Sequence, residues 1–123
     1  MARQARLDAP GLMHHVMARG LNRQRIFYDD RDRDDFLARI PKALERSPNE
    51  IVAWALMPNH VHFLICSGKY GIAPFFRRLF TGYALAFNRR HHRVGYLFQG
   101  RYKSIVCRLM RMTLFPASRA RSK

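Results

Sequence analysis

The chain has 123 residues, 48% of them hydrophobic, which suffices for one compact domain with a core and excludes a protein that is disordered throughout. Its 23 Lys and Arg against eight Asp and Glu give a formal net charge of +15, and a surface so rich in Arg favours a nucleic acid as the partner. Because no run of about 18 apolar residues could span a bilayer, and the first residues lack the apolar stretch of a secretory signal, we expect a cytoplasmic protein that does not bind membranes.

The first predicted element is a β-strand from about Leu12 to Arg19. Apolar and polar residues alternate along it well enough for a strand, and Gly20 with Asn22 marks its end. The strand carries a His14-His15 pair, so one of the two imidazoles either forms a hydrogen bond or faces a cleft.

A helix is predicted next, within residues 28–47. Asp29 and Asp30 are the candidates for its N-cap. Apolar residues four positions apart share one face of this helix: Phe36, Ile40 and Leu44. Pro41 lies inside the pattern and removes a backbone donor, so we expect it to kink the helix or split it in two.

Two β-rich runs follow, "EIVAWALM" and "HVHFLIC", joined at Pro58-Asn59 as a tight antiparallel hairpin or as neighbouring strands. The segment "GIAPFFRRLFTGYALAFNRRHH" then predicts a second helix, and "YKSIVC" a short last strand. This order predicts an α+β, ferredoxin-like split βαβ fold, with an antiparallel sheet and both helices on one face. We assign residues 1–107 to that domain and expect residues 108–123 to form an atypical basic, disordered tail.

The run "MPNHVHFLIC" places two histidines inside a predicted strand. Side chains at positions i and i+2 of a strand lie on the same face, so His60 and His62 can converge on one ion while Val61 packs on the other side. Two imidazoles make an incomplete metal site, and catalysis would need a third ligand and open positions.

Three ordered blocks of the sequence carry a family resemblance, and they cover about Leu12 to Val106. "WALMPNHVHFLI" resembles the HUH signature (histidine, bulky apolar residue, histidine) of single-tyrosine transposases, in particular the insertion-sequence and REP-associated tyrosine transposases. "HHVMARGLNRQRIFYDDRDRDDFLARI" resembles the first strand, Arg-Gly loop and first helix of that family, and "YALAFNRRHHRVGYLFQGRYKS" its second helix and last strand.

The resemblance implies a DNA transposase, with His60 and His62 holding Mg²⁺ or Mn²⁺ against the scissile phosphate of single-stranded DNA. A tyrosine hydroxyl attacks in such enzymes, leaving a 5′-phosphotyrosine and a free 3′-OH, so that strands can be rejoined without ATP. The implied substrates are hairpin ends of DNA, and the implied assembly is a homodimer.

The nucleophile is where the sequence departs from the family pattern. The family places its tyrosine on a helix after the last strand, with an Asn or Gln four residues further on as a metal ligand. This chain has no tyrosine after Tyr102 and no Asn or Gln after Gln99. One codon choice for Leu109 to Met112 reads Asp-Glu-Asp in another frame, so we expect a frameshifted or truncated member whose activity is reduced or absent.

Tyr83 is the alternative nucleophile within the sequence, although its position on the apolar face of the second helix favours a place in the core. The paired His91 and His92 are interpreted as part of a solvated, phosphate-binding helix end. The candidate DNA-binding residues surround the loop after the first strand, the end of the second helix and the last strand: Arg19, Asn22, Arg23, Arg89, Arg90, Arg93, Arg101, Tyr102 and Lys103.

Two other functions stay open. One is a non-enzymatic module that binds nucleic acid through the sheet and its basic rim, with purely structural histidines. The other is an HUH nuclease of replication or conjugation. Binding of a divalent metal separates the first alternative from the transposase, and preference for hairpin DNA over a plain single strand separates the second. The target DNA, the host element and the identity of the metal are not encoded in any motif.

Overall fold

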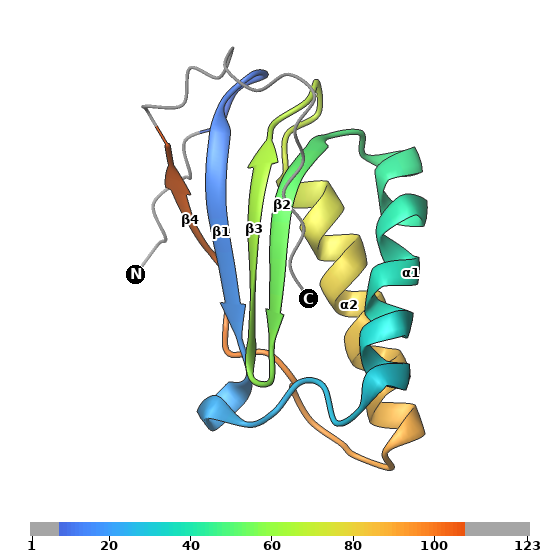
Figure 1. The fold of residues 1–123 in the computed structure, drawn as a ribbon. Helices are drawn as coiled ribbons and strands as arrows, with labels where there is room; N and C mark the ends of the chain where they lie inside the picture. Colours follow the sequence, from blue (N-terminus) through green and yellow to red (C-terminus); the bar gives the residue numbers. More distant parts are fainter. Residues whose placement is uncertain (1–7, 108–123) are drawn as a thin grey trace.

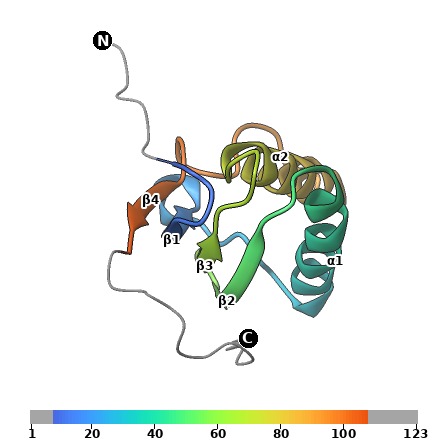
Figure 2. The same cartoon turned by 90° about the horizontal axis from the view of Figure 1, so that it is seen from above.

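The structure, a computed structural model, describes residues 8–107. Its elements are, in chain order, β1 (Met13–Arg19), the short 3-10 turn η1 (Leu21–Arg23), α1 (Asp30–Arg46), β2 (Glu50–Met57), β3 (His60–Cys66), α2 (Ala73–Arg90) and β4 (Lys103–Val106). The sheet has the strand order β2-β3-β1-β4, and each neighbouring pair is antiparallel. Both helices cover the same face of the sheet (Figures 1 and 2), which confirms the predicted ferredoxin-like fold.

The sheet has one face packed under the helices and one face without a helix. Along β3 the burial alternates, with Val61, Phe63 and Ile65 at 0–1% exposure on the helix side. The residues between them therefore lie on the opposite side, which we call the open face (Figure 2). The period of two that was recognised in the sequence thus directs His60 and His62 away from the core.

Helix α1 begins as predicted, because the Asp29 side chain accepts a hydrogen bond from the Asp32 amide at 3.1 Å. Of the two outcomes predicted for Pro41, a kink or a split, the split does not occur, since α1 runs without a break from Asp30 to Arg46. The proline removes one backbone hydrogen bond, but Phe36 and Ile40 of the same helix are buried against the sheet. Packing of that apolar face holds the helix together across the proline.

The loop after β1 is fastened to the turn between β2 and β3. The Gly20 amide donates to the Asn59 carbonyl at 2.9 Å, and the Ile26 amide donates to the Pro58 carbonyl at 2.8 Å. Gly20 is required here, because a Cβ at this position would lie 2.2 Å from the Gln24 carbonyl oxygen. The Arg-Gly pair that ends the strand therefore presses the loop against the turn that precedes His60. We call this part of the molecule the turn end; it is the lower end in Figure 1.

Two predictions remain outside this description. The proposed domain boundary at residue 107 and the basic tail 108–123 concern residues that the structure does not describe. Within residues 8–107 no helix is both long and apolar enough to cross a bilayer.

Candidate functional site

His60 and His62 lie side by side on the open face of β3, as their spacing predicts. Their ring centroids are 4.8 Å apart with the ring planes nearly perpendicular, and both side chains are half-buried. Each ring has one nitrogen held by a neighbour, so the two rings are oriented before anything binds to them.

Asn59 orients His60. The His60 Nδ1 lies 2.8 Å from the Asn59 side-chain oxygen, while the Asn59 amide nitrogen donates to the Arg23 carbonyl at 3.3 Å. The second bond fixes which end of the amide faces the ring, and an amide oxygen only accepts. The proton of neutral His60 therefore sits on Nδ1, and the lone pair is on Nε2.

His15 of β1 orients His62. The His15 Nε2 and the His62 Nδ1 are 3.0 Å apart, a distance at which an N–H···N bond forms, and the two ring planes are nearly parallel, with 15° between them. In the strand register Met17 faces His62, and His15 is its diagonal neighbour two residues back on the same face. When His62 donates from Nδ1 in this pair, its Nε2 also carries a free lone pair.

The surroundings of His62 favour its neutral form. Burial is the largest cause that lowers the pKa of His62, and the neighbouring His60 and His15 lower it further. A neutral ring is the form that can bind a metal through nitrogen. Neither Nε2 of the His60-His62 pair has a hydrogen-bond partner among residues 8–107.

The open face also presents two of the predicted DNA-binding cations. Arg19 faces His60 directly across the β1–β3 pair, and Lys103 faces Met17 across the β1–β4 pair. Lys103 is thus in the same cross-strand row as His62, two strands away, or about 10 Å at the usual strand spacing. A phosphate near the histidines would have positive charge on this side of the sheet.

Further predicted residues surround the turn end. Asn22 and Arg23 are exposed and have backbone φ angles of 55° and 62°, a left-handed conformation that is uncommon outside glycine. Such conformations cluster at binding sites, where the surrounding structure holds them. Arg89 and Arg101 are also exposed.

Arg90 and His91 are in a different place from the one expected. The carboxylate of Asp32, which is fully buried, accepts from Arg90 Nε at 2.9 Å and from His91 Nε2 at 2.9–3.0 Å, and the Arg90 Nη2 lies 2.6 Å from it. The interpretation of His91 as part of a solvated helix end is therefore wrong. Asp32, Arg90 and His91 instead form a clamp between the start of α1 and the end of α2, and the Arg90 charge is largely compensated.

Arg93 and Tyr102 are also engaged within the protein. Arg93 donates to the Gln24 side chain at 2.8 Å and to Asn88. The Tyr102 ring packs on the helix side against Phe76, with ring centroids 5.0 Å apart. This arrangement favours the packing role of Tyr102 over the stacking of a base.

Tyr83 belongs to the core. Its side chain is fully buried, and its hydroxyl donates to the Ile26 carbonyl. Burial is the main cause that raises its pKa, and nearby carboxylates, Asp32 first, raise it further. This buried, hydrogen-bonded phenol favours the core role of Tyr83 over that of a nucleophile. Tyr28, Tyr70 and Tyr96 are the tyrosines with large exposed surfaces among residues 8–107.

The remaining histidine of β1, His14, faces the helix side and is fully buried. Its Nε2 pairs with Asp8 at 3.1 Å and its Nδ1 with the Ser104 hydroxyl at 3.1 Å. Asp8 also accepts from the amide of Ile72, the residue that caps α2. His14 thus ties the segment before β1 to β4 and to the start of α2.

The part of the chain from residue 8 to residue 107 contains no group of three or more His, Cys, Asp or Glu that could hold a metal ion. Any metal at His60 and His62 would need ligands from DNA, water or another segment. Sequence reasoning missed Asn59, which was interpreted only as a turn residue, and did not decide between His14 and His15. The position of Asn59 next to His60 in the sequence could have indicated their hydrogen bond. The contact between His15 and His62 depends on the register of β1 on β3, which the sequence does not show.

Comparison with known proteins identifies the family of this chain. The sequence matches a family described as IS200-like transposase over residues 9–113. A comparison with curated proteins gave no match.

Two solved structures are similar in fold. A REP-associated tyrosine transposase bound to a REP hairpin has a TM-score of 0.68 and 16% identity, over 87% of this chain and 62% of that one. A protein of Deinococcus radiodurans R1, described as a candidate transposase, has a TM-score of 0.63 and 19% identity, over 86% of both chains. The chain therefore spans less than two thirds of the first of these proteins, and at these identities the likeness concerns the fold.

Proposed function

Because this chain belongs to the IS200-like transposase family, we propose that it binds the hairpin end of a single-stranded DNA and holds a divalent metal ion, Mg²⁺ or Mn²⁺, at His60 and His62. The reaction served is cleavage and rejoining of a DNA strand. A homodimer is part of the proposal, on family resemblance alone.

One observation carries the proposal. His60 and His62 lie on the same open face, each with Nδ1 engaged by a neighbour and with Nε2 lacking a partner among residues 8–107. In metal-binding histidines one ring nitrogen binds the metal, and the other is usually hydrogen-bonded to a neighbour that orients the ring.

The donor set fits a metal that also takes oxygen ligands. Mg²⁺ prefers oxygen and retains waters, whereas first-row transition ions such as Mn²⁺ also accept imidazole nitrogen. Two protein ligands leave several coordination positions for phosphate oxygens and water. When bound, the metal would supply Lewis-acid stabilisation of the charge that develops on the scissile phosphate.

The protein groups around the pair would position the DNA. Arg19 and Lys103 are placed to bind phosphate oxygens on the open face, and the exposed Arg23 at the turn end could bind the strand as it leaves. The structural relative bound to a REP hairpin supports a hairpin as the form of DNA recognised.

The chemical step needs a nucleophile that this sequence does not offer at the expected place. In single-tyrosine transposition a phenol oxygen bonds to phosphorus, the 3′-oxygen leaves, and the bond energy is kept in a phosphotyrosine ester. No tyrosine follows Tyr102, and Tyr83 is buried. We therefore propose that the 123-residue chain binds metal and DNA but forms no covalent adduct.

The test of the metal site compares three proteins by electron paramagnetic resonance of Mn²⁺. The wild type should bind Mn²⁺, and the His60→Ala/His62→Ala double variant should not. His92→Asn is the matched control, because His92 is an exposed histidine elsewhere with a φ of 55° that Asn tolerates. Circular dichroism establishes that all three are folded. Equal Mn²⁺ binding by the wild type and the double variant would favour the non-enzymatic nucleic-acid-binding module.

The test of the chemistry mixes the chain with hairpin DNA and Mn²⁺ and looks for an adduct that survives a denaturing gel. No adduct is expected, because proximity of a positioned phenol accounts for a large part of such catalysis. An adduct that disappears in Tyr96→Phe would show that an exposed tyrosine serves as the nucleophile.

A further inference from the structure

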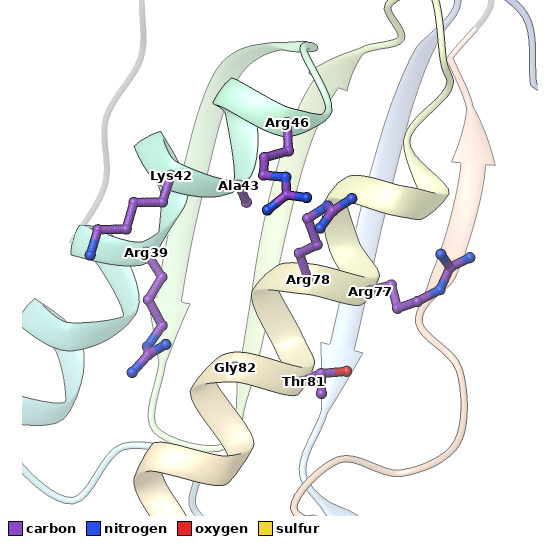
Figure 3. Close-up of a pocket in the computed structure, with 8 residues that line it drawn as sticks. All are labelled: Arg39, Lys42, Ala43, Arg46, Arg77, Arg78, Thr81 and Gly82. Carbon is purple, nitrogen blue, oxygen red and sulfur yellow. The ribbon is translucent and has the colours of Figure 1, made fainter.

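A groove with a volume of about 470 Å³ lies between α1 and α2, in the helical layer (Figure 3). It is lined by two groups of basic residues, one from each helix, over a floor of small residues: Arg39, Lys42, Ala43 and Arg46 from α1, and Arg77, Arg78, Thr81 and Gly82 from α2. None of these cations has a role predicted from the sequence.

Like charges meet across this groove. Arg46 and Arg78 extend toward one another from facing helices (Figure 3), and no acidic residue lines the groove. Among the described residues, Arg39 is the one lining cation with a recorded ion pair, to Asp35 at 3.0 Å. Two guanidinium groups held together without a carboxylate repel one another, and an anion between them removes the repulsion.

The floor keeps the cations accessible. Ala43 of α1 is buried below the rim, and a Cβ on Gly82 would lie 3.0 Å from the Arg39 Nη1. The Arg39 guanidinium therefore lies close to α2 at Gly82, and a larger residue at position 82 would displace it. The small residues leave the space between the helices to the basic side chains.

We propose that this groove binds the phosphodiester backbone of DNA, as a site separate from the histidines. That the ligand is DNA rests on the proposed function. That the groove binds an anion follows from the basic residues that line it. Arginine forks match phosphate oxygens in pairs, which favours phosphate over the isolated carboxylates of an acidic protein. No aromatic residue lines the groove, so it grips the backbone without stacking bases and without reading sequence.

The groove and the histidine pair hold different stretches of DNA. The sheet lies between them, because the groove is in the helical layer and the histidines are on the open face (Figures 1 and 2). Along the molecule the groove involves the C-terminal half of α1 and the N-terminal half of α2, at the opposite end from the turn between β2 and β3 (Figure 1). A duplex stem bound in the groove leaves the open face to the single strand.

The experiment measures binding of a DNA hairpin with a duplex stem by fluorescence anisotropy over a range of KCl concentrations, in EDTA. The slope of log K against log salt is negative, and the Arg46→Gln/Arg78→Gln variant should reduce its magnitude by about 1.8, that is 0.9 for each of two duplex phosphates. Arg31→Gln/Lys69→Gln is the matched control, since it removes the same charge at exposed positions outside the groove and should change the slope far less. Equal changes in both variants, or no binding by the wild type, would overturn the proposal.

A charge-retaining variant guards against an effect on folding. Arg46→Lys/Arg78→Lys keeps two cations, so it should preserve the slope and weaken binding less than the Gln variant. Poly-glutamate serves as the competing polyanion: loss of its binding in the Gln variant, with DNA binding unchanged, would assign the groove to an acidic protein and overturn the proposal. Because EDTA removes metals, failure of the metal site affects only the Mn²⁺ experiment and leaves this one intact.

Discussion

Histidines occupy two kinds of surroundings in this molecule. On the helix side, His14 pairs with Asp8 and His91 with Asp32, so each imidazole is bound to a carboxylate within the protein. On the open face, His60 and His62 are held by an amide oxygen and by another imidazole, and the Nε2 of each has no partner within the described part of the chain. In this molecule the two carboxylate partners join elements of the fold through their histidines, whereas Asn59 and His15 orient the two rings on the open face.

The largest effect is expected from the buried carboxylate. Asp32→Ala removes the partner of Arg90 and His91 and the acceptor of the Tyr28 amide, so the free energy of unfolding should fall by about 3 kcal/mol. Urea denaturation followed by circular dichroism measures it. Mn²⁺ binding by the folded variant should be unchanged. A loss of Mn²⁺ affinity comparable to that of the His60→Ala/His62→Ala variant would erase the distinction between the two environments.

The second effect concerns the buried phenol. Tyr83→Phe leaves the Ile26 carbonyl without its donor inside the core, and the free energy of unfolding should fall by about 1–2 kcal/mol. The same variant should bind hairpin DNA as the wild type does. Unchanged stability together with weaker DNA binding would assign Tyr83 to the DNA-binding surface and contradict its place in the core.

The third effect concerns the contact between His15 and His62 on the open face. His15→Ala removes the partner of His62 Nδ1 without touching a proposed ligand, so affinity for Mn²⁺ should fall about tenfold. His15→Gln keeps a side chain that can accept at this position and should recover part of the loss. Nitrogen NMR of the metal-free protein reports the tautomer of His62 independently. If His15→Ala leaves both the tautomer and the Mn²⁺ affinity unchanged, His15 has no positioning role.

The smallest effect is on stability in acid. Burial raises the pKa of Asp32, but hydrogen bonds from the Tyr28 amide, His91 and Arg90 outweigh burial and hold that pKa below its ordinary value of 3.8. A lowered pKa in the folded state contributes stability that is present above pH 3.8 and is lost as the pH falls through the folded value. Asp8, whose pKa is lowered in the same direction, should act likewise.

Urea denaturation at a series of pH values checks this. Below about pH 4 the decline in stability should be shallower in Asp32→Asn and Asp8→Asn than in the wild type. An acid decline equally steep in all three proteins would locate the responsible carboxyls elsewhere.

Local patterns in the sequence determined the elements of the fold. Alternation along β3 placed His60 and His62 on one face, and the order of strands and helices identified the ferredoxin-like topology, because periodicity and connection order are local properties of a chain. Asp29 was recognised as a helix cap for the same reason, since the amide it binds is three residues away.

Contacts between distant residues were decided only by the tertiary structure. The sequence assigned Arg90 to DNA binding and His91 to a solvated helix end, because their partner, Asp32, is nearly 60 residues earlier in the chain. Likewise, the pairing of His15 with His62 follows from the register of β1 on β3, and a shift of one residue would direct His15 to the other face. The basic groove exists because α1 and α2 pack against each other, which brings Arg46 to Arg78. Sequence periodicity gives the face on which a side chain lies, whereas its partner depends on packing between elements that no local pattern encodes.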